Sequence, residues 1–443
     1  MKKGIIHYLD NEYKQYAHYV VKHRAIPSVI DGFKPVNRKI FYSSLKHVKK
    51  TKDRVSNLAG HVIADTQYHH GNVPCEEAIV LMTQTFKNNL PLFSGEGQFG
   101  SLKEPAPAAS RYIKVCLNDN WNKIFTDFEL LDYREEEEKK IEPFYYLPLI
   151  PLVLINGSSG VALGHATKIL NRNPSDVVDA CINVLKKQPI PLLTPCIDGF
   201  IGTFTQDSEN PKKWAVKGIF EKVSATQVNI KEIPPTYTLE KYENFLDKLI
   251  ENKKILSWSN HGTKEIDYRI KFQREDLVNK TDEEILKTLD LVEFLTENFT
   301  TIDENDEIKI FDNYEDLIKY FVEFRLTYYH KRKIYLLDKV NKEMFDIAQK
   351  GKFIKCILSG KIIINKKTKL EIIEQIKQND IKEIEGSYDT LLKMPIHSLS
   401  KDTYDELVAL MNEKKAYREE IESGNPIKWY GKELVELKKL LKK

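Results

Sequence analysis

The sequence predicts a multi-domain α+β protein. At 443 residues the chain is too long for one ordinary domain, because domains of about 100–200 residues would divide it into roughly two to four. Short helical patterns fill the first third, strand and helix patterns alternate in the middle, and a long amphipathic helical pattern follows residue 313. Hydrophobic residues make up 41% and charged residues 30% of the chain, which is typical of a globular protein.

The first predicted domain, residues 1–133, is mostly helical. Its helical patterns are short because prolines and glycines interrupt them, at Pro27, Pro35, Gly71 and the run 95–100. Pro74 can open a helix in which Ile79, Met82 and Phe86 recur at helical spacing. Spacing alone fits either a helix that reads nucleic acid or an ordinary core helix.

The second predicted domain, residues 134–312, is an α/β unit. It begins at the charge run REEEEKKIEP, which ends in proline and marks a domain boundary. Strand-like pieces such as GFIGTF, KVSATQVNIKEI and YRIKFQ then alternate with helical pieces such as PSDVVDACINVLKK and TLEKYENFLDKLIENKK. The order of strands in the sheet cannot be derived from this pattern.

The last third predicts a long helix with a coiled-coil seam. The seam residues are Leu317, Phe321, Phe324, Tyr328, Leu337, Val340, Met344 and Ile347. If the helix is continuous from Tyr314 to about Lys352, it extends about 55–60 Å. Apolar residues at Tyr404, Leu407, Met411, Leu434, Leu437 and Leu441 can supply an antiparallel return. We expect arms at 313–352 and 401–443 with residues 353–400 at the tip; the alternative is an amphipathic helix packed on the core.

Composition excludes several classes of protein. No apolar run approaches the ~20 residues of a membrane helix, and the N-terminus lacks the apolar core of a signal peptide. The 5 cysteines are odd in number and scattered, so we expect a reducing cytoplasm and neither a disulfide framework nor a zinc site. The net charge of only +3 leaves the partner open, since nucleic-acid binding would require basic residues gathered on particular surfaces.

Two segments carry side chains suited to phosphate chemistry. RAIPSVIDGFKPVNRK gathers Arg24, Lys34, Arg38 and Lys39 in a short span, and such cations can hold phosphates without reading bases. By spacing alone, a solvated basic face is the simpler interpretation. In YHHGN, His69 and His70 precede a glycine turn, and an imidazole can accept a proton or donate to a phosphate near neutral pH. Adjacent histidines are nevertheless more often structural or solvent-exposed.

Two further segments place a reactive or apolar side chain beside glycine-rich turns. GEGQFGS precedes AASRY, where Arg111 is the cation next to Tyr112; a phenol needs such a neighbour to act as a nucleophile. With 22 tyrosines in the chain, this dipeptide alone has little weight, and the glycines lack the GKS/T sequence of a nucleotide loop. In NGSSGVALGHAT, Val161 follows a glycine-serine turn and could wedge between base pairs, although an ordinary buried strand and turn would show the same pattern.

Taken together and in order, these motifs resemble the breakage-reunion subunit of type IIA DNA topoisomerases. The motifs are RAIPSVIDGFKPVNRK, YHHG, GQFGS, AASRY, NGSSGVALGHAT, EIPP, FVEFRLTYYHKRK, GKFIKCILSGKI and LLKMPIHSLSKD, and they span essentially the whole chain. The resemblance implies a winged-helix DNA-binding domain at 1–133 and an α/β tower domain at 134–312. It also implies a long antiparallel coiled coil at 313–352 and 401–443, with a helical C-gate dimerisation domain at 353–400.

The resemblance also implies roles for individual residues. Tyr112 would attack a DNA phosphate and form a 5′-phosphotyrosyl link, with Arg111, His70 and Arg24 completing the catalytic site. Lys34, Arg38, Lys39 and His69 would contact DNA. Val161 stands where the family has an intercalating isoleucine, so the wedge is smaller but still apolar.

The family's metal site and ATPase lie outside the region resembled. Glu135–Glu138 lack the pattern of the family's metal-binding domain and are interpreted as solvated, so we expect no metal site in this chain. Mg²⁺ and ATP are expected to be bound by a partner large subunit with ATPase and Toprim domains, within a holoenzyme that contains a homodimer of this chain. The other expected partner is double-stranded DNA, with no membrane.

The residues of two motifs indicate a branch of the family. YHHG lacks the proline of the bacterial HPHG form, and KKIEPFYYLPLIPLVLING is closer to the eukaryotic and T-even phage pattern. A phage-encoded chain would work in the host bacterial cytoplasm. The alternatives are a bacterial topoisomerase IV or gyrase A fragment, or a catalytically silent DNA-binding module, which the intact Arg111-Tyr112 pair argues against.

Overall fold

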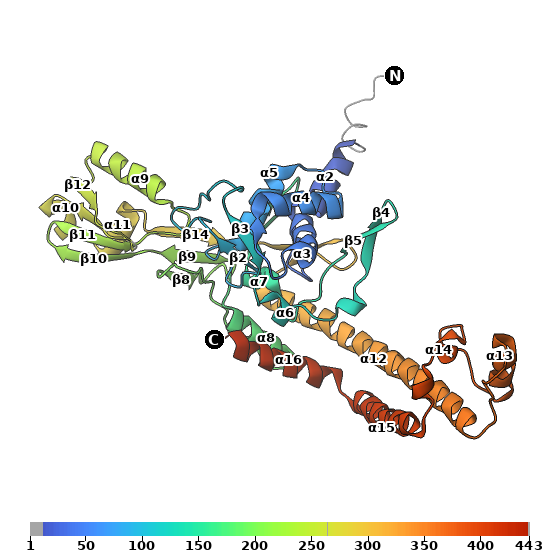
Figure 1. The fold of residues 1–443 in the computed structure, drawn as a ribbon. Helices are drawn as coiled ribbons and strands as arrows, with labels where there is room; N and C mark the ends of the chain where they lie inside the picture. Colours follow the sequence, from blue (N-terminus) through green and yellow to red (C-terminus); the bar gives the residue numbers. More distant parts are fainter. Residues whose placement is uncertain (1–11, 264, 442–443) are drawn as a thin grey trace, which may run out of the picture. The chain divides into compact units, whose positions relative to one another are not determined.

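The protein is described by a computed structural model that covers residues 12–263 and 265–441 (Figure 1). These residues form two compact units: the first holds the described residues up to Arg325 and those from Gly431 onward, and the second is Leu326–Tyr430. Helices and strands are mixed in the first unit, whereas the second is built mainly of helices. The predicted multi-domain α+β class is therefore confirmed at this level.

The N-terminal part of the first unit combines short helices with a small antiparallel sheet. Its helical elements are α2 (Lys14–Val20), the π-helical turn η2 (Val21–Ala25), α3 (Pro35–His47), α4 (Val55–Thr66) and α5 (Asn72–Thr83). Pro35 begins α3, where a missing N–H costs nothing and the fixed φ favours the helix. Strands β1 (Asp53–Arg54), β2 (Phe93–Glu96) and β3 (Lys114–Leu117) form a sheet in the order β1-β3-β2.

Two hairpins follow this sheet. The predicted charge run forms the hairpin β4 (Tyr133–Glu136) and β5 (Lys139–Pro143), with α6 (Trp121–Ile124) and η3 (Phe128–Leu130) before it. Glu137 and Glu138 both have positive φ, 48° and 63°, as a two-residue hairpin turn requires. After α7 (Leu152–Ile155), the second hairpin joins β6 (Ser158–Val161) to β7 (Ala166–Ile169), and α8 (Pro174–Leu185) comes next. Glu135–Glu138 are exposed, as the sequence predicts.

Antiparallel sheets dominate residues 203–311. A four-stranded sheet has the order β10-β11-β13-β12, and a three-stranded sheet has the order β14-β9-β8. The strands are β8 (Thr203–Gln206), β9 (Lys213–Lys217), β10 (Ile219–Ser224), β11 (Gln227–Glu232), β12 (Ser257–Asn260), β13 (Tyr268–Lys271), β14 (Val292–Thr296), β15 (Phe299–Ile302) and β16 (Ile308–Phe311). Helices α9 (Leu239–Glu251), α10 (Arg274–Val278) and α11 (Asp282–Thr288) bury apolar residues against the four-stranded sheet.

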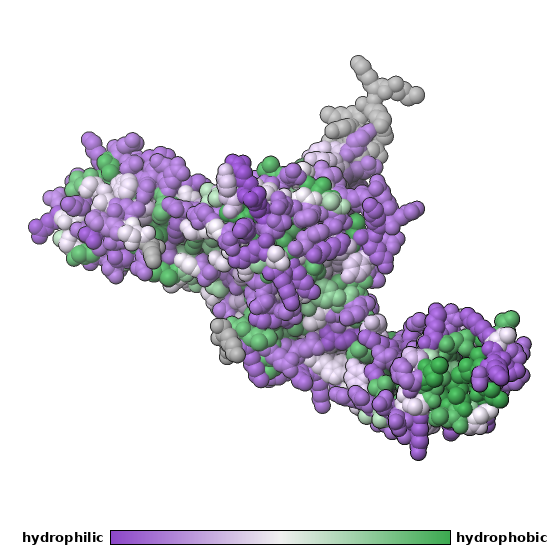
Figure 2. Space-filling view, in the orientation of Figure 1, coloured by the Kyte–Doolittle hydropathy of each residue, from purple (hydrophilic) through white to green (hydrophobic). Residues whose placement is uncertain are grey.

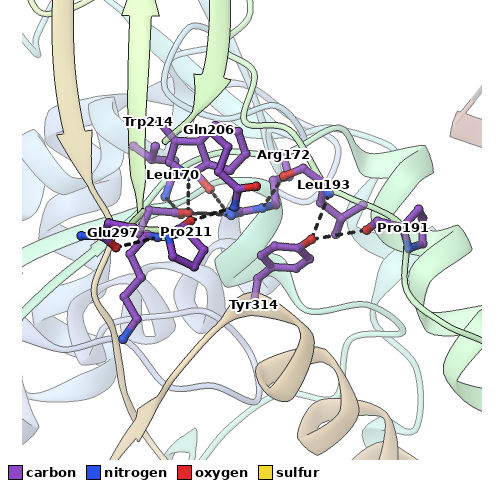
Figure 3. Close-up of polar contacts among 11 residues, drawn as sticks. Leu170, Arg172, Pro191, Leu193, Gln206, Pro211, Trp214, Glu297 and Tyr314 are labelled. Carbon is purple, nitrogen blue, oxygen red and sulfur yellow. Dashed lines mark hydrogen bonds and ion pairs between the residues drawn. The ribbon is translucent and has the colours of Figure 1, made fainter. Parts of the chain in front are cut away.

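A buried ion pair joins four separate segments of the first unit (Figure 3). The Arg172 guanidinium, between β7 and α8, donates to both carboxylate oxygens of Glu297 at 2.9 and 2.7 Å. Glu297 also accepts from the Leu170 backbone N–H and from the Trp214 indole N–H on β9. The same guanidinium lies 4.9 Å from the ring centre of Tyr314, the first residue of α12. Because both charges are fully buried, only this complete set of partners makes their burial tolerable.

The second unit contains most of a long helix and its return. α12 (Tyr314–Leu358) runs a few residues beyond the predicted end, and α15 (Lys401–Ser423) and α16 (Pro426–Leu441) follow it. Lys414 Nζ lies 2.6 Å from Glu343, and Lys333 donates to the Glu422 and Gly424 carbonyls. As positions rise along α15 they fall along α12, so the pairing is antiparallel. The predicted long helix is confirmed, and the return is interrupted at Gly424-Asn425.

A small apolar core lies at the tip of the second unit. It involves α13 (Lys369–Gln378), α14 (Asp389–Leu392) and the neighbouring 3₁₀ turn η4 (Ile396–Ser398), and its buried residues are Phe353, Ile362, Ile372, Ile376, Ile381, Ile384 and Leu391. Hydrophobic side chains also gather on the surface of this tip (Figure 2). Those exposed include Leu358, Ile363, Leu370 and Ile396, of which Ile396 is 89% exposed. No helix among the described residues has the length and apolarity that crossing a membrane requires.

Candidate functional site

A cavity of about 1130 Å³ in the first unit gathers basic side chains from six segments. Its cationic and imidazole lining comes from η2, α3, the turn before α5, the turn after α5, β4 and β7, namely His23, Arg24, Lys34, Lys39, His69, His70, Lys87, Arg134 and Lys168. Only Glu77, Glu135, Glu136 and Glu142 add acidic groups. The lining therefore favours an anionic ligand, although the net charge of the whole chain gives no such indication.

Three of the predicted DNA-contacting cations hold protein partners. Lys34 Nζ donates to the Ser159 carbonyl at 2.7 Å, and burial lowers the pKa of Lys34. Lys39 Nζ donates to the Thr66 carbonyl at 2.7 Å and to Glu142. Arg38 is only 5% exposed and pairs with Asp31 through two hydrogen bonds of 2.8 and 3.0 Å. Arg38 therefore differs from the expected DNA contact. Its guanidinium neutralises the buried carboxylate of Asp31 and is not presented to solvent.

The adjacent histidines lie at the cavity with a tyrosine that the sequence analysis did not select. The Tyr19 hydroxyl of α2 lies 3.1 Å from His69 Nε2 and 3.1 Å from His70 Nε2. Burial lowers the pKa of His70, and the nearby His69 and Arg24 lower it further. A neutral imidazole at this position can accept a proton near neutral pH.

Tyr112 is presented on the surface just before β3. Its side chain is 70% exposed, and the Arg111 guanidinium carbon lies 4.9 Å from the centre of its ring. The GEGQFGS segment supports this turn: Gly97 has φ 104°, and a Cβ there would lie 2.9 Å from the Ile113 side chain. The glycines thus shape the loop that carries the tyrosine.

The predicted catalytic residues fall into two groups within one chain. Arg24 and His70 line the cavity, as does the predicted DNA contact His69, whereas neither Arg111 nor Tyr112 belongs to its lining. Among the residues that the structure describes, no hydrogen bond or ion pair joins Tyr112 to Arg24 or His70. In the described part of one copy, Tyr112 and Arg111 therefore stand in a different group from the cavity residues Arg24 and His70.

Val161 lies at the end of β6 and is 83% exposed, which is unusual for a valine. The preceding Gly160 permits a close contact, because a Cβ there would lie 2.1 Å from the Ala25 carbonyl oxygen. The Lys34 bond to the Ser159 carbonyl also holds this hairpin in place. The hairpin thus presents an apolar side chain to solvent on a fixed support beside the Arg24 segment.

Several cavity residues escaped sequence reasoning. His23, Arg134 and Lys168 each stand outside a motif, and Tyr19 is one of 22 tyrosines. Burial lowers the pKa of Arg134, whose Nε has no hydrogen-bond partner among the described residues. No local signal distinguishes these residues, since they meet only through the tertiary fold. The described residues also contain no group of three or more His, Cys, Asp or Glu side chains that could hold a metal ion.

The fold and the site define the class of protein. The model of the DNA gyrase/topoisomerase IV A-subunit family matches residues 24–436, which includes every motif from Arg24 to the return helix. The chain therefore belongs to this family, and the resemblance inferred from its motifs is confirmed.

Individual relatives show which members of the family this chain is similar to. The chain is 36% identical to the DNA topoisomerase medium subunit of Enterobacteria phage T4, over 97% of this chain and 98% of the relative. It is 31% identical to the mitochondrial DNA topoisomerase 2 of Dictyostelium discoideum, matching 100% of this chain but 36% of that longer protein. A crystal structure of the DNA-binding, cleavage and re-ligation domain of Plasmodium falciparum topoisomerase II superposes with a TM-score of 0.84 and 30% identity. It matches 97% of this chain and 63% of that one.

Proposed function

We propose that this chain is the DNA-cleaving and religating subunit of an ATP-dependent type IIA topoisomerase. It makes a transient double-strand break so that another duplex can pass, which relaxes or decatenates DNA. The observation that carries the proposal is the solvent-exposed Tyr112 with Arg111 against its ring, in a chain that the family model matches over residues 24–436.

The proposed reaction is a transesterification. The Tyr112 phenol oxygen loses its proton and attacks phosphorus, a new O–P bond forms, and the bond from phosphorus to the 3′ oxygen breaks. The 3′ oxygen takes up a proton from water as it leaves as the 3′-hydroxyl. Arg111 stabilises the charge that develops on the phosphate oxygens. The phosphotyrosyl ester retains the energy of the broken bond, so the reverse attack by the 3′-hydroxyl reseals the strand without ATP.

Two parts of the first unit are proposed to be the winged-helix and tower domains that the resemblance to type IIA topoisomerases implies. Helices α3, α4 and α5 with the sheet β1-β3-β2 form a winged-helix domain that grips the duplex, and the sheets of residues 203–296 form the tower. Val161 wedges between base pairs of the bent duplex. Such a bend costs about 1–6 kcal/mol, and contacts from the cavity's basic residues offset it.

The active site is proposed to form between two copies of this chain. Tyr112 and Arg111 of one copy meet Arg24, His69 and His70 of the other, which accounts for the two separate groups in one chain. The exposed Leu358, Ile363, Leu370 and Ile396 at the tip of the second unit are the proposed C-gate contacts of the homodimer, since so many exposed apolar side chains mark an interaction surface.

Mg²⁺ and ATP are proposed to be bound by a separate large subunit with Toprim and ATPase domains. One observation supports this: the T4 relative, which matches over 98% of its own length, is named a medium subunit. The described residues do not fit a metal site, so no step here is assigned to one. The proposed location is the cytoplasm of a bacterial host.

Replacing Tyr112 with phenylalanine tests the function directly. The variant lacks the nucleophilic oxygen, so with the partner subunit, Mg²⁺ and supercoiled DNA we expect no protein-linked DNA above background after denaturation. Tyr417→Phe removes another exposed tyrosine hydroxyl and should trap DNA like the wild type. If Tyr112→Phe and the wild type trap equal amounts, the nucleophile is another group; if neither traps any, the chain is a DNA-binding module.

Shortening the wedge tests the role of Val161. Val161→Ala removes two carbon groups at about 0.8 kcal/mol each, so we expect the bent form of the bound duplex to become roughly tenfold less populated. Energy transfer between dyes at the ends of a short duplex measures the bend. Val223→Ala, at another exposed valine, should leave it unchanged. If the duplex is bent equally by Val161→Ala and Val223→Ala, Val161 does not act as the wedge.

A further inference from the structure

The hydroxyl of Tyr19 bridges two imidazoles that are adjacent in sequence. It lies 3.1 Å from Nε2 of His69 and 3.1 Å from Nε2 of His70, although Tyr19 is about fifty positions away on α2. The Tyr19 ring also lies 5.3 Å from that of His23 and 6.3 Å from that of His70. The bridge is therefore part of a packed cluster of rings at the cavity.

Proton counting makes this bridge asymmetric. A phenol has one proton, so Tyr19 can donate to only one of the two Nε2 atoms. With neutral imidazoles, the other ring must then carry its proton on Nε2 and donate it to the phenol oxygen. The tautomer of His69 is thereby tied to that of His70, and the two possible arrangements interconvert when protons shift along the bridge.

The two ends of the bridge face different surroundings. His70 is partly buried, and burial, His69 and Arg24 together lower its pKa, which favours a neutral ring. His69 is exposed to solvent. Among the described residues neither imidazole has a hydrogen-bond partner other than Tyr19, so each Nδ1 remains available, one on the more buried ring and one on the solvent-exposed ring.

We propose that His70, Tyr19 and His69 form a proton relay that carries the proton of the attacking tyrosine to solvent. This inference rests on the proposed function. As the Tyr112 oxygen of the other copy bonds to phosphorus, its proton passes to His70 Nδ1. His70 Nε2–H passes its proton to the Tyr19 oxygen, Tyr19 passes its own to His69 Nε2, and His69 Nδ1–H releases one to water.

The charges balance at every step of this relay. One proton enters at His70 and one leaves at His69, so both imidazoles and the phenol begin and end neutral, with the tautomers exchanged. Resealing runs the relay in reverse and returns a proton to the Tyr112 oxygen. Tyr19 is thus a positioning residue, because it acts through His70.

Tyr19→Phe tests the relay while keeping the ring contacts with His23 and His70. In the reconstituted holoenzyme we expect single-turnover cleavage to slow on the order of 100-fold, a loss typical of acid-base catalysis, with unchanged noncovalent DNA binding. Tyr16→Phe on the same helix removes an exposed hydroxyl and should cleave like the wild type. Cleavage by Tyr19→Phe at the wild-type rate would overturn the relay.

The solvent isotope dependence separates a relay from a purely structural tyrosine. Several protons move together in the relay, so the wild-type rate should fall along a curve as D₂O replaces H₂O, whereas the Tyr19→Phe rate should fall along a straight line. His69→Gln should slow cleavage about as much, and the double variant Tyr19→Phe/His69→Gln should be no slower than either single variant. Straight lines for both wild type and variant, or additive losses, would reject the relay.

Failure of the relay remains distinguishable from failure of the proposed function. Tyr112→Phe must abolish covalent trapping if the chain cleaves DNA, whatever Tyr19 does. A chain that traps DNA through Tyr112 but is indifferent to Tyr19→Phe would keep the function and lose the relay.

Discussion

Mixed assemblies of Tyr112→Phe and Arg24→Ala chains are expected to nick one strand of DNA at close to the wild-type rate, although Tyr112→Phe alone cuts neither strand and Arg24→Ala alone cuts both far more slowly. If Tyr112 of one copy works with Arg24 of the other, a mixed pair has one site with both defects and one site with none. If each copy used its own Arg24, both sites of the mixed pair would carry one defect and neither would cut. The expectation follows from the two separate residue groups within one chain.

The measurement uses two differently tagged chains that are produced together and purified over both tags. When the large partner and Mg²⁺ are added, nicked circles should appear at close to the wild-type rate of single-strand cleavage, without linear product. The two homodimeric variants provide the baselines, and Arg24→Ala alone should lose on the order of 10²–10³-fold as one charge-stabilising donor is removed. Intact circles from the mixed assembly would place Arg24 and Tyr112 in the same copy.

Glu297→Gln is expected to lower the free energy of unfolding by about 3–5 kcal/mol, the range for breaking a buried ion pair by removing one partner. The carboxylate accepts four hydrogen bonds, from Leu170, Trp214 and the two guanidinium nitrogens of Arg172. An amide keeps the shape, but its NH₂ would face donors and the Arg172 cation would lose its counter-charge in a site without solvent.

Urea unfolding of the whole chain, followed by near-ultraviolet circular dichroism, measures this loss. Asp267→Asn serves as the control: it breaks a partly exposed pair with Lys231, and its unfolding midpoint should lie close to that of the wild type. Replacing both partners, as Arg172→Met with Glu297→Leu, should recover most of the stability because no charge stays buried. A Glu297→Gln midpoint equal to that of the wild type would show that the pair adds nothing.

Local patterns predicted the long helix well. The apolar spacing from Leu317 to Ile347 indicated a helix from Tyr314, and α12 begins there and ends at Leu358. The period of 3.6 residues belongs to the helix itself, so it can be derived from neighbouring residues. The exact end could not, because it depends on how Phe353 and Ile362 pack at the tip of the second unit.

The site was predictable only in part. Tyr112, Arg24 and His70 were identified by resemblance, and the structure places each at the surface or at the cavity. Arg38 looked equally suited to phosphate by its spacing, but its burial depends on Asp31, seven positions away, which the fold turns into the core. Tyr19 had no signal at all, since its partners lie about fifty positions along the chain.

The helical and strand segments, the set of reactive side chains and the family follow from the order of the residues, because periodicity and motif order are properties of neighbouring residues. Which of those side chains meet depends on the folded chain. The fold brings Tyr19 to the two histidines, buries Arg38 and Glu297 with their counter-charges, and leaves Tyr112 outside the lining of the basic cavity. A charge or a proton acts through distance in space, and the fold alone fixes that distance.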